Sequence, residues 1–241
     1  MTATATLTTY KMYIDGQWVD AASTEYFESD DPFRAEPWAR IPRGTAADVD
    51  RAVRAAHKAF TSGEWPRLTA SRRGALLRKL GDLISERSKQ LAEIEVRDNG
   101  KLYAEMSMQT AYMAQWYHYY GGLADKIEGA VIPTDKADTF NFTRYEPLGV
   151  VGVISPWNYP YQLAMLPVAA ALAAGNRALL KPSEITPLTS LRIAELMAEA
   201  GMPDGVVNVV PGLGSVAGQY IAEHERIAKI AFTGSTATGR R

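Results

Sequence analysis

The chain has 241 residues, 46% of them hydrophobic and 22% charged, a composition typical of a globular protein with a sizeable core. Its net charge of −1 argues against a field that would steer it to nucleic acid or to an anionic membrane. It contains no cysteine, which excludes disulfides, thiolate metal sites and a cysteine nucleophile within these residues. His57, His118 and His224 lack metal-ligand spacing, so we expect no metal site.

The start of the chain predicts no export signal. The segment MTATATLTTYKM lacks a basic region followed by an apolar run, and residues 1–9 are expected to form a frayed tail. The longest apolar run, residues 163–174, is shorter than the roughly 20 residues of a membrane-spanning helix and contains Pro167. A cytoplasmic protein is therefore the expectation.

A hairpin and a loop are predicted next. Asp15-Gly16 stands between two apolar runs, which is a strong signal for a tight β-hairpin over residues 10–20. Residues 28–45 are rich in Asp, Pro and Arg, which favours an extended surface loop with little regular structure.

Helices dominate the following stretch. Apolar residues recur at helical spacing over residues 46–60, 71–96 and 103–127, and Asn99-Gly100 would end the second helix. An aromatic stripe on the third helix favours packing against another element or subunit over ligand stacking. Its members are Tyr112, Trp116, Tyr119 and Tyr120. Alternation over residues 139–145 then predicts a strand.

From residue 150 the pattern changes to alternating strands and helices. The predicted strands are 150–154, 177–180, 206–210 and 229–232, and the predicted helices are 161–174, 187–200 and 215–223. Continuous apolar strands alternating with helices predict an α/β fold, with a right-handed, Rossmann-like parallel sheet flanked by helices. Ligands of such sheets bind at the carboxyl ends of the strands.

The four strand ends carry chemistry that suits a dinucleotide, and we expect their loops to line one crevice. The loops are Ser155-Pro156-Trp157-Asn158, Lys181-Pro182-Ser183-Glu184, Pro211-Gly212-Leu213-Gly214 and Thr233-Gly234-Ser235. Glu184 stands where doubly wound folds place a ribose-binding acid, and Lys181 could hold the same ribose. Gly234 and Ser235 precede a helix, where backbone N–H groups can approach a phosphate.

The familiar glycine fingerprint is missing, however. Gly212, Gly214 and Gly218 form only a near miss to it, and residues 234–239 are spaced like a phosphate loop but precede Arg240-Arg241 instead of Lys and Ser or Thr. That disfavours a nucleotide triphosphatase. From the residues alone, three plain alternatives stay open: Lys181 and Glu184 as a surface pair, Trp157 as core, and Gly234 as a simple turn.

Several segments together resemble the aldehyde dehydrogenase superfamily. They are SPWNYP, LLKPSE, VNVVPG and FTGSTATG in this order and spacing, preceded by DGQWVD, the long helices and TFNFTRYEPLGVVGVI. The resemblance implies an amino-terminal helical region over residues 1–149, with a hairpin and an oligomerisation-type strand. It also implies a Rossmann-like NAD-binding core over residues 150–241.

The resemblance also implies roles for individual residues. Asn158 would donate its side-chain N–H to the oxyanion of a thiohemiacetal, and Lys181 and Glu184 would hold the adenosine ribose. Gly214 would lie by the adenine and Ser235 by the pyrophosphate. The full expected cofactor set is Ile154, Ser155, Pro156, Trp157, Lys181, Ser183, Glu184, Gly214, Gly218, Phe232, Thr233, Gly234 and Ser235. A carboxylate at Glu184 would repel a 2′-phosphate, which favours NAD, with NADP possible.

The family reaction also needs a cysteine nucleophile and a general-base glutamate, which the family places after the FTGS motif. We therefore expect the catalytic domain to be missing and this chain to be inactive alone. The alternatives are a non-catalytic dinucleotide-binding fragment and a truncated subunit that acts through protein–protein contacts. The implied partners are an aldehyde and further copies in a homodimer or homotetramer. Tyr112, Met113, Trp116 and Tyr161 suggest an apolar substrate entrance.

Overall fold

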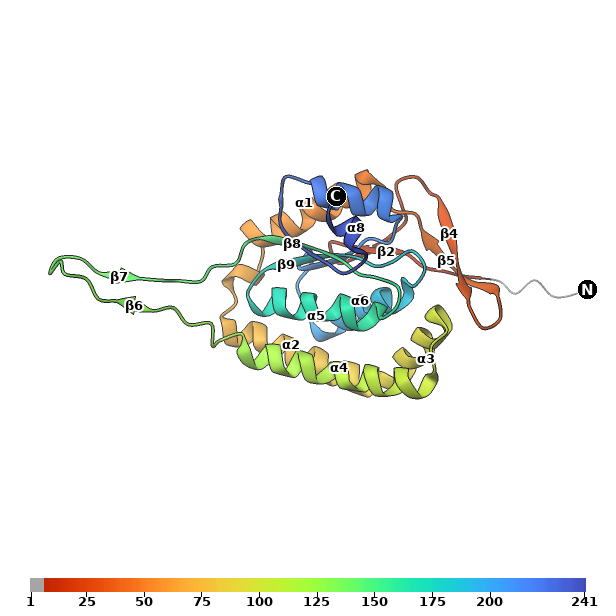
Figure 1. Ribbon diagram of the computed structural model, residues 1–241, viewed down its shortest axis with the longest axis horizontal. Coiled ribbons are helices and arrows are strands. Elements are labelled where there is room, and N and C mark those ends of the chain that lie inside the picture. The colour runs from red at the N-terminus through yellow and green to blue at the C-terminus, as the bar shows by residue number, and fades with distance from the viewer. Residues whose placement is uncertain (1–6) are drawn as a thin grey trace, which may run out of the picture.

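The computed structural model describes residues 7–241, and its centre is a six-stranded sheet within those residues (Figure 1). The strand order is β11-β8-β9-β10-β2-β3. The first four neighbours run parallel: β11 Ile227–Phe232, β8 Val150–Ile154, β9 Arg177–Lys181 and β10 Val207–Val209. The predicted parallel α/β sheet is confirmed, and all four predicted strands are present.

The predicted hairpin is also confirmed, and it extends the main sheet. β2 (Met12–Ile14) and β3 (Gln17–Val19) are antiparallel, and β2 pairs with β10. The turn residues Asp15 and Gly16 have φ of 52° and 74°, the positive values that a tight type I′ turn requires. The Asp15 N–H donates to Asn208 Oδ1 at 2.9 Å, which ties the turn to β10.

The prediction of an irregular loop over residues 28–45 is wrong. β4 (Tyr26–Asp31) and β5 (Glu36–Pro42) form an antiparallel hairpin there. Ala39 and Ile41 point into the core, whereas Glu36 and Arg40 on the other face of β5 are exposed, so the abundant charged residues concealed the alternation. Asp31 closes the turn by accepting the N–H groups of Phe33 and Arg34.

The expectation of a frayed tail over residues 1–9 is wrong for its last two residues. Thr8–Thr9 form β1, which pairs in parallel with β5 through Ala39 and Arg40. Residues 1–6 lie outside the described part of the chain.

The helices differ from prediction mainly in where they break. α1 (Ala46–Thr61) is as expected, but the single helix predicted over residues 71–96 is two helices, α2 (Ala70–Glu86) and α3 (Ser88–Asn99). The chain turns at Arg87, whose φ and ψ of −100° and 9° leave the helical range. Gly100 ends α3 in the left-handed conformation, as predicted.

Beyond α3, α4 (Tyr103–Leu123) ends four residues before the predicted position. Of its aromatic stripe, Trp116 and Tyr120 pack against the core, whereas Tyr112 and Tyr119 are largely exposed. The helix predicted over residues 215–223 is a π-helical turn (Gly214–Gly218) followed by α7 (Gln219–Glu223).

Helices cover both faces of the sheet (Figure 1). α1 lies on one face, against β8, β9 and β10. α5 (Pro160–Ala173) and α6 (Leu188–Ala200) lie on the other face, and α2, α3 and α4 form a further layer over them. A short helical turn, η1 (Trp65–Arg67), joins α1 to α2, and α8 (Thr236–Gly239) follows β11. This arrangement buries β8, β9 and β10 completely apart from the end of β8.

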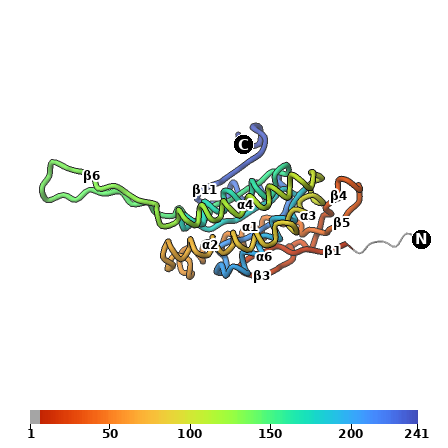
Figure 2. Tube along the Cα trace, turned by 90° about the horizontal axis from the view of Figure 1, so that it is seen from below, coloured from red at the N-terminus to blue at the C-terminus, as the bar shows by residue number. Residues whose placement is uncertain are grey.

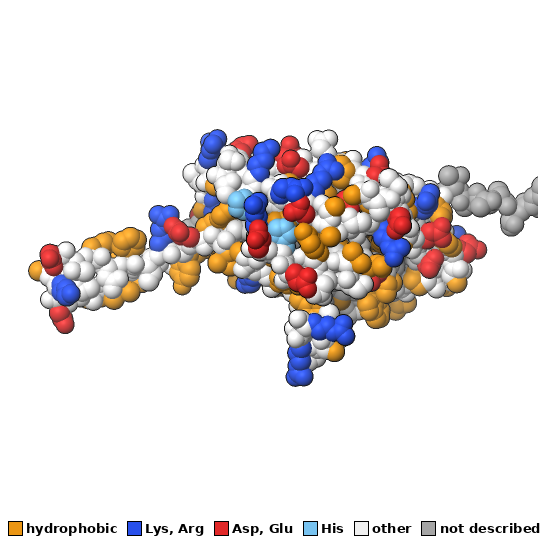
Figure 3. Space-filling model, turned by 90° about the horizontal axis from the view of Figure 1, so that it is seen from above, with side chains coloured by type: hydrophobic (Ala, Val, Ile, Leu, Met, Phe, Trp, Pro, Cys, Tyr) orange, Lys and Arg blue, Asp and Glu red, His pale blue; other side chains and the backbone are white. Residues whose placement is uncertain are grey.

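An arm projects from this body (Figures 1 and 2). The strand predicted over residues 139–145 is present only as β7 (Asn141–Phe142), which pairs with β6 (Val131–Ile132). Hydrophobic side chains lie along the arm, as Figure 3 shows, and include Val131, Phe140 and Phe142. In residues 7–241, no helix combines the length and apolarity needed to cross a membrane.

Candidate functional site

The carboxyl ends of neighbouring parallel strands meet in register. Ile154 at the end of β8 is opposite Lys181 of β9 on one side and opposite Phe232 of β11 on the other. Backbone hydrogen bonds continue past the strand ends, from Ser155 N–H to Lys181 O at 3.2 Å and from Thr233 N–H to Ile154 O at 3.1 Å. The first, second and fourth loops therefore leave the sheet side by side.

A cleft of about 410 Å³ opens between the first and fourth of these loops. It is lined by Ile154, Ser155, Pro156, Trp157, Asn158, Phe232, Thr233, Gly234, Ser235 and Thr238. Nine of these are residues predicted from the sequence. Trp157 is 57% exposed, so the alternative that it is plain core is wrong.

Thr238 is the lining residue that the sequence did not single out. It lies three residues after Ser235, whose hydroxyl oxygen accepts the Thr238 N–H at 3.2 Å and caps α8. The two hydroxyl oxygens are 2.9 Å apart. A Ser-x-x-Thr spacing at a helix start was the available signal.

Two polar groups of the first loop have different environments. Asn158 is exposed at the mouth of the cleft. Ser155 is buried, and within residues 7–241 its hydroxyl has no hydrogen-bond partner. The loop is tethered to the second loop by the Thr186 hydroxyl, which donates to Trp157 O at 3.4 Å.

A second cluster forms around Lys181. Its ammonium donates to Glu184 Oε2 at 3.1 Å and to Pro182 O at 3.0 Å, and its side chain is only 3% exposed. An ordinary surface pair would not bury its lysine in this way, so that alternative is wrong. An ammonium held so deeply in the protein needs its carboxylate partner.

Burial and pairing shift the two pKa values of this cluster. Burial lowers the pKa of Lys181, and the charge of Glu184 and its hydrogen bond act against that shift. Burial raises the pKa of Glu184, but the charge of Lys181, together with hydrogen bonds from Lys181 and from backbone N–H groups, outweighs it and leaves that pKa below its usual value. The Glu184 carboxylate is therefore charged near neutral pH.

Two glycines of the third loop complete the Lys181 cluster. A Cβ added to Gly218 would stand 3.7 Å from Lys181 Cδ, so this glycine borders the lysine stem. The backbone N–H of Gly214 contributes to holding down the pKa of Glu184. A Cβ at Gly214 would meet no described atom within 4 Å, which leaves open space beside the carboxylate. Ser183 is buried within its own turn, where its hydroxyl oxygen accepts the Ile185 N–H at 3.4 Å.

The residues expected to line one crevice form two neighbouring groups along the strand ends. The cleft belongs to the first and fourth loops, whereas Lys181, Glu184, Gly214 and Gly218 lie together farther along the strand ends. The reason is the strand order, because β11 and β10 are separated by β8 and β9. Three strand spacings of about 4.8 Å each keep the outer loops apart.

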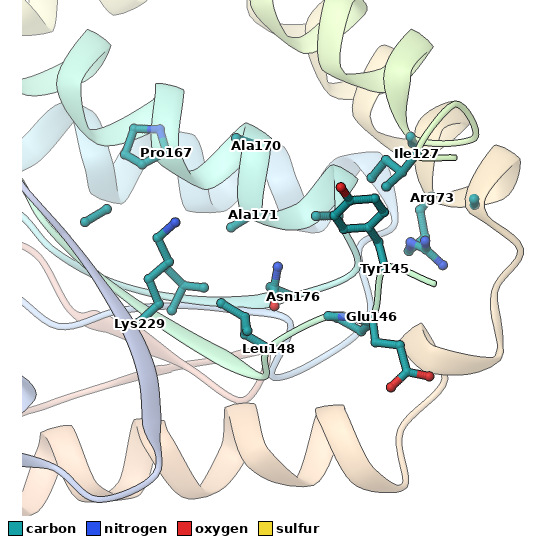
Figure 4. A pocket seen from close by; sticks show the side chains of 16 residues that line it. Arg73, Ile127, Tyr145, Glu146, Leu148, Pro167, Ala170, Ala171, Asn176 and Lys229 are labelled. Atoms are coloured by element: carbon teal, nitrogen blue, oxygen red, sulfur yellow. The ribbon is translucent and has the colours of Figure 1, made fainter. Parts of the chain in front are cut away.

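A larger cavity, of about 560 Å³, lies at the opposite end of these strands (Figure 4). Its walls include Pro167, Ala170 and Ala171 of α5 and Lys229 of β11. It also borders Asn176, which directly precedes β9. Because α/β sheets bind ligands at the carboxyl ends of their strands, size alone does not make this cavity the site.

Comparisons with known proteins identify the family. The model of the aldehyde dehydrogenase family matches residues 18–241. The chain belongs to the aldehyde dehydrogenase family. The family suggested by the SPWNYP, LLKPSE and FTGSTATG segments is thereby confirmed.

Two curated relatives illustrate the similarity in sequence. The chain is 43% identical over 236 residues to the mitochondrial 10-formyltetrahydrofolate dehydrogenase of Mus musculus, covering 96% of this chain and 26% of that protein. It is 46% identical over 231 residues to the (Z)-2-((N-methylformamido)methylene)-5-hydroxybutyrolactone dehydrogenase of Acinetobacter baylyi, covering 96% of this chain and 47% of that protein. This aldehyde dehydrogenase chain thus spans half or less of the length of these relatives.

Solved structures agree in three dimensions. The NAD⁺ complex of an aldehyde dehydrogenase from Bacillus cereus superposes with a TM-score of 0.94 at 44% identity, over 96% of this chain and 47% of that chain. PnpE, from Pseudomonas sp. WBC-3, in complex with nicotinamide adenine dinucleotide gives a TM-score of 0.93 at 49% identity, over 96% and 47%. The fold predicted from the sequence is the fold of this family.

Proposed function

We propose that this chain forms the NAD-binding half of an enzyme that oxidises an aldehyde to a carboxylic acid with NAD. The observation that carries the proposal is the buried Lys181 ammonium paired with Glu184 at the carboxyl end of β9, beside the open space at Gly214. Membership of the aldehyde dehydrogenase family and the NAD complexes of two similar structures support it. When bound, NAD would accept the hydride.

The Lys181 cluster fits an adenosine ribose. The Glu184 carboxylate can accept hydrogen bonds from ribose hydroxyls, and the Lys181 ammonium can donate to them. Gly214 leaves room for a flat ring close to the backbone. A 2′-phosphate would face the Glu184 charge, which favours NAD over NADP.

The cleft between the first and fourth loops suits the other end of the cofactor. Ile154, Pro156, Trp157 and Phe232 give it apolar walls, and Thr233, Gly234 and Ser235 offer N–H and hydroxyl groups to the pyrophosphate. Asn158 at its mouth would donate its amide to the oxyanion of the reacting aldehyde. One such donor is worth about 3 kcal/mol in the transition state.

The thiol nucleophile of this reaction cannot come from these 241 residues, which contain no cysteine. We therefore expect no aldehyde oxidation by this polypeptide alone. The test combines calorimetry with NAD and an assay for NADH formation with several aldehydes, on purified chain of verified mass. NAD binding without NADH formation is the expected outcome. Absence of NAD binding would refute the proposal, and NADH formation would refute its second half.

An interaction role is the second candidate, and the exposed apolar arm favours it. Val131, Phe140 and Phe142 lie in the solvent on β6, β7 and the segment between them. Exposed apolar surface of this kind marks contact sites between proteins. A homodimer or homotetramer held partly by this arm is the proposed assembly. Light scattering on the chain and on a Phe142→Ser variant tests it, and an unchanged mass in the variant counts against the arm.

A further inference from the structure

Two buried acids on one face of α3 have no part in the proposed chemistry. Glu95 and Asp98 are 3% and 0% exposed and stand one helical turn apart. Buried carboxylates are costly unless their oxygens are hydrogen-bonded. Their partners therefore show what the two side chains hold in place.

Each acid accepts an N–H from the first turn of a different helix. The Tyr161 N–H, in the first turn of α5, donates to Glu95 Oε1 at 3.2 Å. The Leu188 N–H, at the start of α6, donates to Asp98 Oδ2 at 2.9 Å. Within residues 7–241 neither helix has a side-chain cap at its own N-cap residue, Tyr159 or Pro187. The α3 acids thus cap both helices from a distance.

The second oxygen of each acid is also occupied. The Thr189 hydroxyl of α6 donates to Glu95 Oε2, so that Glu95 joins the first turns of α5 and α6. The Ser29 hydroxyl of β4 donates to Asp98 Oδ1 at 2.6 Å. Both oxygens of each carboxyl group therefore accept a hydrogen bond, which holds each acid against the elements that supply the donors.

The two capped helices begin directly after the loops of the candidate site. Asn158 lies three residues before Tyr161, and Glu184 lies four residues before Leu188. A further contact reaches the first loop from the end of α3, since Lys101 Nζ lies 2.9 Å from the centre of the Tyr159 ring. The contacts of α3 with the first turns of α5 and α6 therefore fix where both loops end.

We propose that Glu95 and Asp98 are positioning residues that hold the Trp157–Asn158 loop and the Lys181–Glu184 loop in their cofactor-binding geometry. The inference rests on the proposed function, because it assigns these loops to NAD. Neither acid touches the site. Each acts through the helix that starts from its loop.

The same contacts make the junction sensitive to pH. Burial raises the pKa of Glu95 and of Asp98 to about 7, although hydrogen bonds from Thr189, Tyr161, Ser29 and Leu188 act against the shift. The ionisable groups that face the pair are Tyr161 of α5, Tyr10 before β2, and Lys101, with Arg97 and Arg192 acting on Tyr10. An opened junction would return each acid to its ordinary, lower pKa. Opening therefore becomes easier as the pH rises from about 5 to about 7.

Amide hydrogen exchange of Tyr161 and Leu188, resolved by NMR on the whole 241-residue chain without nucleotide, tests the positioning role. We expect Glu95→Ala to lower the protection of Tyr161 about tenfold or more, and Asp98→Ala to do the same at Leu188. Glu95→Gln keeps an acceptor for the Tyr161 N–H and should restore its protection. Glu93→Ala, an exposed acid on the same helix, is the matched control.

Calorimetry with NAD on the same proteins tests whether loss of these helix caps weakens cofactor binding. The dissociation constant should rise about tenfold in Glu95→Ala and return towards wild type in Glu95→Gln. If Glu95→Ala does not fold, the pH series decides: protection of Tyr161 should fall between pH 5 and pH 7 in wild type and fall clearly less in Glu95→Gln, where only Asp98 remains to titrate. The positioning role is overturned if Tyr161 and Leu188 exchange in the alanine variants at the same rates as in the wild type. It is also overturned if the protection of Tyr161 depends on pH equally in Glu95→Gln and in the wild type. Failure of the wild-type chain to bind NAD overturns the proposed function instead.

Discussion

The ammonium of Lys181 lies 3.1 Å from Oε2 of Glu184, and the lysine is almost completely buried whereas the glutamate keeps contact with solvent. Because the Lys181 ammonium is fixed inside the protein, its hydrogen bond holds the more exposed Glu184 carboxylate in one orientation. Glu184 can then present its remaining acceptor capacity to a ligand at the strand ends. A pair exposed at both ends would have little reason to keep one geometry.

Replacing Glu184 with Gln tests this arrangement. The variant keeps an acceptor for Lys181 but removes the negative charge, so NAD affinity should fall by about tenfold or more, the usual effect of losing a charge-assisted hydrogen bond. The preference for NAD over NADP should also weaken, because the repulsion of a 2′-phosphate is removed. Calorimetry with both nucleotides measures the two effects.

The matched control is Glu146→Gln, which removes the acid of an exposed ion pair with Arg144. It should bind NAD as the wild type does. Equal NAD affinity in Glu184→Gln and Glu146→Gln would remove Glu184 from the site.

A glycine on β8 provides a test of packing behind the first loop. A Cβ at Gly152 would come within 2.7 Å of Ile221 Cγ2, closer than real contacts allow, so Gly152→Ala should destabilise the chain by about 1–3 kcal/mol. Gly214→Ala adds the same methyl group into open space and should change stability by less than about 0.5 kcal/mol. Urea unfolding of both variants makes the comparison. Equal midpoints would mean that Ile221 moves aside without cost.

The buried acid Glu95 predicts how stability depends on pH. Its folded pKa of about 7 exceeds its ordinary value of 4.5, so the folded chain binds a proton that the unfolded chain has released between these values. The corresponding stability is full below pH 4.5 and is lost as the pH rises through 7, by on the order of 3 kcal/mol. Glu95→Gln should reduce this slope in urea unfolding curves taken from pH 4.5 to pH 8. Asp98 contributes in the same direction and remains in that variant.

Arg177 at the start of β9 ties the last turn of α1 to the sheet. Its buried guanidinium donates to Gly175 O and Ala59 O and lies over the Phe60 ring, 4.7 Å from its centre. Arg177→Ala leaves these carbonyls without a donor and opens a cavity, so a loss of about 3–5 kcal/mol is expected. Arg177→Lys should recover only part of it, since an ammonium cannot reproduce the planar fork. Thermal unfolding should show the wild type as most stable, Arg177→Lys as intermediate and Arg177→Ala as least stable. An alanine variant as stable as the wild type would contradict the prediction.

Much of the candidate site followed from local sequence. Trp157, Asn158 and Ser235 could be assigned to strand ends because apolar runs and helix periodicity place strands and helices reliably when both faces of a sheet are covered. Thr238 and the separation of the cleft from the Lys181 cluster could not be assigned in this way. They depend on which strands are neighbours, and no local pattern encodes the order β11-β8-β9-β10.

The β4–β5 hairpin and the break between α2 and α3 both depend on tertiary packing. The β4–β5 hairpin exposes several charged residues, which suggested a loop, although Ala39 and Ile41 pack its inner face against the core. The break at Arg87 lies inside a continuous helical pattern. Packing of α3 against α6 and β4 accompanies this turn, and such contacts override helix propensity.

By itself the sequence determined the parallel α/β core, the family and most residues of the strand-end loops, because these depend on periodicity and on short motifs. Only the tertiary structure decided that Lys181 is buried, that the loops divide into a cleft and a separate cluster, and that Glu95 and Asp98 cap α5 and α6. Those caps join residues 66 and 90 positions apart in the chain. Contacts at such separations arise from the packing of whole elements, and a local pattern carries no trace of them.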